Sequence, residues 1–347
     1  MRNSKLLALA RKTGNPVIED GTATLVWQGS ASPLLIDDYH DWEDNPQQMV
    51  RIGSGLWAYS FSLPKDAYLE YAFLDERTRG RLPDPLNPNF IDTGVDDNFN
   101  QFFYMPKAKP SPLAQSRKGA PRGTVTRHEV PTLENAVGAK RTVHLYQPPV
   151  DGPVPLVIVY DGTDYLRRGK INVIVDNLIA QKRIRPFAMA LIQNGGQARV
   201  LEYSCSEATL AFLIESVFPL AKENLWLISP DQAPYGVIGA SLGGLMALYT
   251  GLRLPKLFQK VLSQSGAFGT PEYRYAIVDL IRYAPRPDIQ VWMDTGKFEW
   301  LLEGNHKMFA LLKKQGYWVK MREFAGGHNY TSWRNDIFHG LKKLFHT

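Results

Sequence analysis

The stretch that most constrains this fold is GVIGASLGGLMAL, residues 236 to 248, in which glycines flank Ser241 on both sides. Glycine weakens a regular strand or helix, so glycines this close together indicate a sharp turn of the backbone. An apolar run precedes the turn, and an Ala/Leu-rich segment of helical length follows it. When a strand turns abruptly into a helix, small residues two positions either side of the apex prevent collisions. The spacing Gly239-x-Ser241-x-Gly243 therefore predicts a strand–turn–helix unit with Ser241 at its apex.

Residues 123 to 347 alternate short apolar runs with segments of helical length. PLVIVYDG, FAMALIQN, KVLSQSG and IQVWMDTG have the character of strands covered on both faces. Residues 208 to 224, ATLAFLIESVFPLAKEN, are a helix-length segment between two of them. This alternation predicts an α/β domain with a mostly parallel sheet, in which ligands bind at the carboxyl ends of the strands.

The first part of the chain has a different pattern. Residues 20 to 105 consist of short segments rich in β-branched and aromatic residues, separated by Gly, Pro, Asn and Asp. This pattern predicts an all-β sandwich, and we assign it to a domain spanning residues 1 to 107. Residues 108 to 122 are rich in Pro, Lys, Ser and Gly and are expected to be a linker. The second domain then spans residues 123 to 347.

Composition limits the classes of partner and compartment. The 40 Lys and Arg residues against 34 Asp and Glu give a net charge of +6 that is spread along the chain, so no nucleic-acid partner is expected. One cysteine, Cys205, excludes an intramolecular disulfide and a metal cage built from cysteines. The apolar run near the N-terminus is too short for a signal peptide or a membrane span. We therefore expect a soluble, cytoplasmic protein with no membrane partner.

Ser241 is the candidate nucleophile. A helix that begins directly after it would direct its positive end at the serine oxygen, which favours negative charge there. The alternatives are a glycine-rich turn with an incidental serine and a phosphate-binding loop. For the phosphate-binding loop, no G-K-[ST] follows and the spacing is not G-x-G-x-x-G. The strand–turn–helix context favours the nucleophile.

A serine hydroxyl needs a base, and neutral imidazole is the usual one. Of the seven histidines, His328 stands out in REFAGGHNYTSWR, because it follows a strand-like segment and two glycines and precedes a terminal helical segment. A loop at the carboxyl end of the last strand is where a hydrolase with this chain order holds its base. His328 is therefore the candidate base.

The acid should lie between the nucleophile and the base in sequence. Asp294 and Glu299 both follow or end the penultimate predicted strand, in IQVWMDTGKFEW. Asp294 lies at the strand end, where a buried acid can be structural. Glu299 lies in the loop and opens a helix, where it can reach His328 or simply complement the helix dipole. We prefer Glu299 and keep Asp294 as the alternative.

An oxyanion needs two hydrogen-bond donors. One is the backbone N–H of Leu242, directly after the nucleophile. The other is expected from the loop after the first core strand, LVIVYDGTDYL, at Gly162 or Thr163, although Asp161-Gly162 can equally be an ordinary turn. No metal or organic cofactor is implied by this set.

Several stretches together carry a family resemblance: RTVHLYQPP, LVIVYDGTDYL, RVLEYSCSEATLAFLIESVFPLAKE, GVIGASLGGLMAL, VLSQSGAF and AGGHNYTSWR. Over roughly residues 123 to 345 the chain resembles the esterase branch of the α/β-hydrolases, and within it the enterochelin (ferric enterobactin) esterase type. Residues 34 to 88 are similar to the early-set immunoglobulin-like domain that precedes the hydrolase in that family. The resemblance implies an α/β-hydrolase fold preceded by an immunoglobulin-like sandwich.

The resemblance also implies roles for individual residues. It gives Ser241 as nucleophile, His328 as base and Glu299 as acid, where feruloyl-esterase relatives usually have Asp. Arg199 and Glu202 match an Arg-x-x-Glu element of the family, and we expect them to form a structural ion pair.

The expected function is a serine carboxylester hydrolase that acts through an acyl-enzyme on a small-molecule ester, such as a siderophore-like trilactone or another aromatic-acyl ester. The alternatives are a feruloyl or acetyl-xylan type esterase whose first domain contacts carbohydrate, and a non-catalytic binding protein on a hydrolase scaffold. Residues 84 to 103 are long, polar and rich in Pro, Asn and Asp. We expect the first domain to lie over the carboxyl edge of the sheet and shape the acyl pocket.

Overall fold

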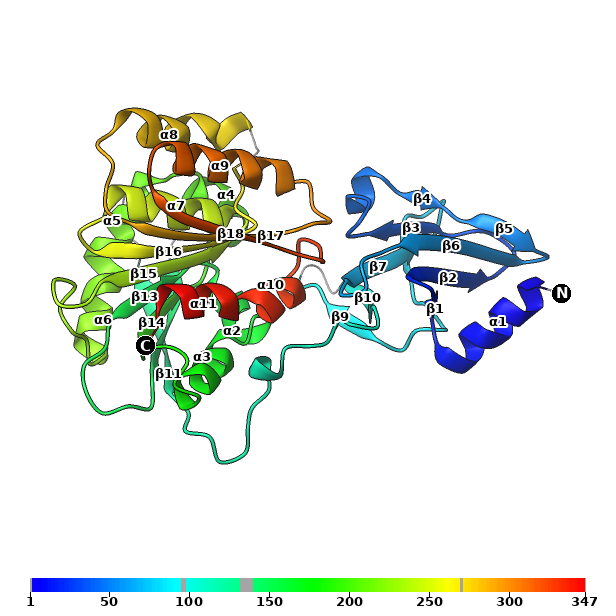
Figure 1. Cartoon of the computed structure of the whole chain (residues 1–347), viewed down its shortest axis with the longest axis horizontal. Helices are drawn as coiled ribbons and strands as arrows, with labels where there is room; N and C mark the ends of the chain where they lie inside the picture. Colours follow the sequence, from blue (N-terminus) through cyan, green and yellow to red (C-terminus); the bar gives the residue numbers. More distant parts are fainter. Residues whose placement is uncertain (1, 95–97, 132–139, 269–270, 347) are drawn as a thin grey trace. The chain divides into compact units, whose positions relative to one another are not determined.

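The computed structural model describes residues 2–94, 98–131, 140–268 and 271–346, which form two compact units (Figure 1). Unit 1 is Met1–Lys109 together with two short segments from later in the chain, Gly296–Trp300 and Phe324–His328. Unit 2 is Pro110–Thr295, Leu301–Glu323 and Asn329–Thr347. The sequence predicts a first domain of residues 1 to 107, a linker of residues 108 to 122 and a second domain from residue 123, and it does not predict the two later segments that belong to unit 1.

Unit 2 is built on an eight-stranded sheet with the order β11-β12-β14-β13-β15-β16-β17-β18. The strands are β11 (Thr124–Pro131), β12 (Lys140–Gln147), β13 (Leu156–Val159), β14 (Ala188–Ile192), β15 (Tyr235–Ala240), β16 (Phe258–Gln264), β17 (Gln290–Gly296) and β18 (Trp318–Phe324). β12 pairs antiparallel with β11 and β14, whereas β14, β13, β15, β16 and β17 are parallel. The predicted α/β fold with a mostly parallel sheet is confirmed.

Helices cover both faces of this sheet. They are α2 (Gly162–Arg167), α3 (Ile171–Ala180), α4 (Arg199–Tyr203), α5 (Glu207–Phe212), α6 (Phe218–Asn224), α7 (Leu242–Arg253), α8 (Pro271–Tyr283), α9 (Leu302–Lys314), α10 (Tyr330–Asp336) and α11 (Phe338–Leu344). In Figure 1, α7, α8 and α9 lie on one face, and α2, α3, α10 and α11 lie on the other. Every residue of β13, β14 and β15 is buried, as expected for strands covered on both sides.

The predicted helical segment 208–224 is helical throughout, since a π-helical turn, Leu213–Val217, joins α5 to α6. Among the described residues no single helix is long and apolar enough to cross a membrane. A bent pair, Gly196–Tyr203 and Glu207–Asn224, with 101° between its halves, reaches the required length and composition together.

Unit 1 is β-rich and contains two sheets, with the orders β1-β2-β6-β5 and β4-β3-β7-β10-β9, and β8 pairs with β7. The strands are β1 (Val17–Glu19), β2 (Thr22–Gln28), β3 (Leu34–Asp37), β4 (Gln47–Gln48), β5 (Val50–Gly53), β6 (Leu56–Ser62), β7 (Tyr68–Leu74), β8 (Arg81–Leu82), β9 (Phe90–Asp92) and β10 (Phe99–Tyr104). One apolar core receives side chains from both sheets, among them Leu25, Leu35, Phe61 and Phe73. The predicted strands of the first domain are confirmed.

Helix α1 (Arg2–Thr13) precedes these strands and is not predicted by the sequence. Its Ala10 packs in a small apolar cluster with Val17, Val26 and Leu56, which closes the outer side of the first sheet. Because α1 carries three leucines and two alanines between polar residues, the signal for it is a short amphipathic pattern.

The stretch predicted as a linker, residues 108 to 122, is not a free connection. It contains a helical turn, η2 (Pro112–Ala114), whose Leu113 is buried. The side-chain amide of Asn177 on α3 donates to the carbonyl oxygens of Leu113 and Gln115, at 2.7 and 2.9 Å. One buried leucine and two backbone acceptors hold the segment. Composition does not predict this packing, because neither contact depends on which residue types are abundant in the segment.

Candidate active site

Ser241 sits at a sharp turn between β15 and α7. Its backbone has φ 57° and ψ −124°, a region that costs a non-glycine residue about 1–3 kcal/mol. Neighbouring backbone fixes the turn: the Ser241 N–H donates to the carbonyl oxygen of Gln264 at 2.9 Å, and the Ser241 carbonyl accepts from Ala267 at 3.0 Å. The predicted strand–turn–helix unit is confirmed, with the strained residue at the serine.

The glycine two residues before the serine is required by space. A Cβ on Gly239 would overlap the backbone carbonyl of Gly243, in the first turn of α7. Backbone cannot move aside as a flexible side chain can, so the turn closes only when residue 239 lacks a side chain. This contact explains why the residue two positions before Ser241 is glycine.

The predicted oxyanion donors lie at the same edge of the sheet as Ser241. Leu242 is the first residue of α7, and the first N–H groups of a helix have no acceptor within it. Gly162 and Thr163 begin α2, directly after β13, which is the parallel neighbour of β15. The Thr163 hydroxyl is buried and makes no hydrogen bond within the described part of the chain. Three candidate donors therefore follow two adjacent strands.

Asp161, just before these donors, is held by a network that sequence reasoning missed. Asp161 is 2% exposed, and Arg199 donates to both of its carboxylate oxygens at 2.7 Å. Asn194 donates to the same carboxylate at 2.6 Å. The guanidinium of Arg199 also lies 3.4 Å from the carbonyl oxygen of Ala240, the residue before Ser241. Arg199 thus connects the candidate oxyanion loop with the strand end that carries the serine.

The expected ion pair between Arg199 and Glu202 is wrong. Arg199 pairs with Asp161, whereas the buried Glu202 pairs with Arg141 on β12 and accepts from the Gly195 N–H at 2.7 Å. Burial disfavours the charged guanidinium of Arg199, but the hydrogen bonds and charge of Asp161 outweigh it and raise its pKa above the usual value. Arg199 and Glu202 each have an ionic partner, but both partners come from outside their own helix.

Glu299 and His328 lie together in unit 1. Oε2 of Glu299 is 2.5 Å from Nδ1 of His328, and Oε1 accepts the Gly296 N–H at 2.5 Å. The Glu299 side chain is fully buried and that of His328 is 14% exposed. One carboxylate oxygen therefore fixes the acid to its own loop while the other orients the imidazole, which is the arrangement a base and its supporting acid need.

Asp294 occupies a different environment, inside unit 2 on β17. Its carboxylate accepts from the side-chain amide of Gln264 at 3.1 Å and from the indole of Trp292 at 3.2 Å. Glu299 lies in the turn before α9 and does not open that helix, whose first-turn acid is Glu303. The expectation that Glu299 complements a helix dipole is therefore not met, and its carboxylate contacts His328.

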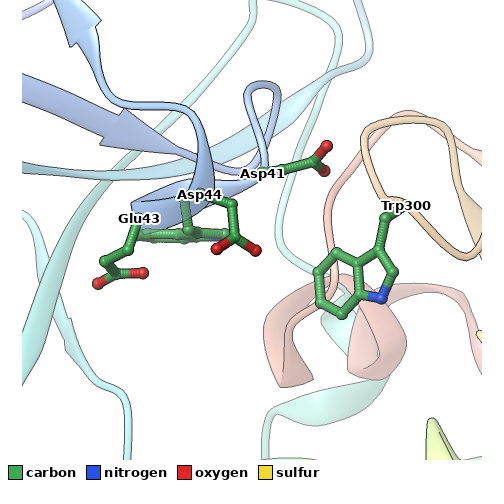
Figure 2. Close-up of a pocket in the computed structure, with 5 residues that line it drawn as sticks. Asp41, Glu43, Asp44 and Trp300 are labelled. Carbon is green, nitrogen blue, oxygen red and sulfur yellow. The ribbon is translucent and has the colours of Figure 1, made fainter.

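Trp300 contributes an exposed aromatic surface beside His328. Its ring lies 4.7 Å from the His328 ring, and the residue is 54% exposed. Within unit 1 it lines a cavity of about 470 Å³ with four consecutive residues, Asp41, Trp42, Glu43 and Asp44. Figure 2 shows the Asp41 carboxylate on the side of the cavity that faces Trp300. These residues were not predicted from the sequence, although an acidic run interrupted by tryptophan was the available signal.

Comparisons with known proteins identify the family. Residues 134–344 match the Esterase family model. The iron(III) enterobactin esterase of Dickeya dadantii is 24% identical over 362 residues, covering 89% of this chain and 81% of that protein.

Two solved structures share the fold over nearly the whole chain. The ferric enterobactin esterase of Salmonella typhimurium has a TM-score of 0.82 at 22% identity and covers 97% of this chain and 98% of that one. The Shigella flexneri enterobactin esterase, solved in the presence of enterobactin, has a TM-score of 0.75 at 20% identity, with 96% of each chain covered. The chain therefore belongs to the Esterase family, as a hydrolase similar to the enterobactin esterases.

Proposed function

We propose that this esterase is a serine carboxylester hydrolase whose triad is Ser241, His328 and Glu299. The observation that carries the proposal is the 2.5 Å contact between the buried Glu299 carboxylate and Nδ1 of His328. A carboxylate at Nδ1 fixes the tautomer and makes Nε2 the atom that exchanges a proton with the nucleophile. The strained turn at Ser241 supports the same assignment, because such turns present a nucleophile at the end of a strand.

The reaction proceeds in two halves. Nε2 of His328 takes the Ser241 proton while Oγ attacks the ester carbonyl, and the resulting oxyanion is stabilised by the N–H of Leu242 and by Gly162 or Thr163. The tetrahedral intermediate expels the alcohol, which receives the proton from His328. Water then gives a proton to His328 and attacks the acyl-enzyme. The carboxylic acid product leaves as Oγ recovers its proton from His328. Glu299 stabilises the imidazolium that forms in each half.

For the substrate we propose a siderophore-like trilactone or another ester with an aromatic acyl group. The support is the similarity to enterobactin esterases along nearly the whole chain, unit 1 included. The two-sheet arrangement of unit 1 supports an early-set immunoglobulin-like domain. A single cysteine supports a reducing compartment, and we place the enzyme in the cytoplasm.

The test is a panel of p-nitrophenyl esters of graded chain length, run beside a catecholate trilactone and methyl ferulate. We expect the full chain to hydrolyse the trilactone with the highest kcat/KM and Ser241→Ala to hydrolyse none of the panel. Equal rates for the unaltered chain and Ser241→Ala would contradict the assignment of Ser241 as the nucleophile. A preference for methyl ferulate over the trilactone would instead contradict the proposed substrate class.

A further inference from the structure

The loops that carry Glu299 and His328 are anchored in the apolar core of unit 1. Phe298, directly before the acid, is 8% exposed and belongs to the same core cluster as Leu35 and Phe61. The ring of Tyr39 lies 5.3 Å from the Phe298 ring, in an edge-on arrangement. Ala325, three residues before the base, packs against the same cluster. Both loops therefore pack an apolar side chain against the N-terminal strands.

Backbone hydrogen bonds join the loops to each other and to β7. The Tyr68 N–H donates to the Ala325 carbonyl oxygen at 2.9 Å. The two loops are joined by a bond from the Lys297 N–H to the Phe324 carbonyl, at 2.9 Å, and by one from the Phe298 N–H to the Gly326 carbonyl, at 3.2 Å. These contacts tie the acid loop, the base loop and the first residue of β7 together.

Gly327, the residue before the base, lies against a buried carboxylate of the N-terminal strands. A Cβ at position 327 would overlap the carboxylate and the Cβ of Asp38. Asp38 follows β3, is 1% exposed, and is itself fixed because its Oδ2 accepts the Glu70 N–H at 2.8 Å. The Asp38 side chain has little freedom to move, so it limits where Gly327 can lie. It thereby limits the position of His328, the next residue.

From these contacts we infer that the β-rich N-terminal region is part of the catalytic apparatus, because it positions the Glu299–His328 pair. Asp38, Phe298 and Gly327 are the positioning residues. The inference rests on the proposed function, which supplies the role of the pair. Loops at the ends of strands are ordinarily mobile, whereas a misplacement of about 1 Å in a catalytic group can lower a rate by about 100-fold.

The first test compares two substitutions in one core. Phe298→Leu removes the anchor beside Glu299. Phe73→Leu changes the same core at the end of β7 that is distant from Tyr68. We expect similar losses of Tm, with kcat lowered on the order of 10- to 100-fold only by Phe298→Leu and KM little changed. If kcat falls equally in both variants, or in neither, the positioning role is wrong.

The second test uses the contact at Gly327. We expect Gly327→Ala to lower kcat because its methyl group displaces the base loop, whereas the control Gly80→Ala, also in unit 1, leaves kcat unchanged. Asp38→Gly removes the atoms that the methyl group would meet, so the double variant Gly327→Ala with Asp38→Gly should recover part of the lost kcat. A double variant no better than the less active single variant would overturn the assignment of this contact.

A readout independent of turnover separates this inference from the proposed function. A hydrogen bond between imidazole Nδ1–H and a carboxylate gives a proton NMR signal far downfield, which Glu299→Gln should abolish. We expect this signal in Phe73→Leu and Gly80→Ala and its loss or shift in Phe298→Leu and Gly327→Ala. An unchanged signal in all four variants contradicts the positioning role. Absence of ester hydrolysis in the unaltered chain, with the signal behaving as expected, would contradict only the proposed function.

Discussion

Oε2 of Glu299 lies 2.5 Å from Nδ1 of His328, and Phe298 and Gly327, which precede the two residues, both pack among the N-terminal strands. In the sequence, Glu299 follows β17 and His328 follows β18 of the α/β sheet, yet both residues belong to the β-rich unit.

Glu299→Gln should lower kcat by about 1,000- to 10,000-fold, because the amide keeps the shape of the acid but removes the charge that stabilises the imidazolium. Asp294→Asn is the matched control, since its carboxylate bonds to Gln264 and Trp292 and is expected to act on stability. Steady-state kinetics and thermal melts of both variants decide the matter. A well-folded Asp294→Asn without activity would make Asp294 the acid.

Arg199→Lys should lower kcat about tenfold, a loss that a displaced oxyanion donor can account for. Lysine keeps the charge but cannot donate to both Asp161 oxygens and also approach the Ala240 carbonyl, so the start of α2 loses its fixed place. Arg253→Lys, at an exposed pair with Glu207, is the control. Equal kcat values for the two variants would show that Arg199 does not act on the oxyanion loop.

The acidic cavity beside Trp300 should select substrates by charge. Asp41 and Asp44 are exposed at its wall, and like charges about 4 Å apart repel by about 1 kcal/mol in water. Asp41→Asn and Asp44→Asn should each raise kcat/KM for an anionic ester about two- to fivefold over a neutral ester of the same size, an effect that salt suppresses. Asp66 is an exposed acid that is not among the cavity-lining residues, so Asp66→Asn should leave kcat/KM for the anionic ester unchanged at low and at high salt. A gain that persists at high ionic strength would exclude an electrostatic origin.

Removal of residues 1–109 should abolish hydrolysis of every ester, p-nitrophenyl acetate included. The sequence predicts a milder outcome, in which only large substrates are lost because the first domain shapes the acyl pocket. The burial of Phe298 and the bond from Tyr68 to Ala325 make us expect the stronger effect, since the acid and base loops lose their anchors. The fragment should begin at Pro110 so that Leu113 keeps its contact with Asn177. Full kcat/KM of a folded fragment on p-nitrophenyl acetate would refute this expectation.

The sequence predicts most of the second domain because its signals are local. Apolar runs identify the strands, and the glycines around Ser241 identify the turn, whose strain the structure shows directly. Glu299 could be preferred over Asp294 because strand ends and loops can be located from the same pattern.

The features that the sequence does not predict depend on contacts between distant segments. Arg199 reaches Asp161, 38 residues earlier in the chain, although Glu202 is its neighbour on the same helix. Gly327 meets Asp38 across most of the chain, and Phe298 enters a core formed by strands from another part of the sequence. No periodicity or spacing carries such pairings, since they arise only when the strands are assembled.

The most direct test of the triad is the mass of the enzyme after reaction with a fluorophosphonate, followed by peptide mapping. We predict a single adduct on Ser241, formed slowly in Glu299→Gln and absent in a folded Ser241→Ala variant, whose hydrolysis should fall by about three or more orders of magnitude. An adduct on another residue, or a Ser241→Ala variant that keeps as much as about a tenth of the activity, would contradict the account.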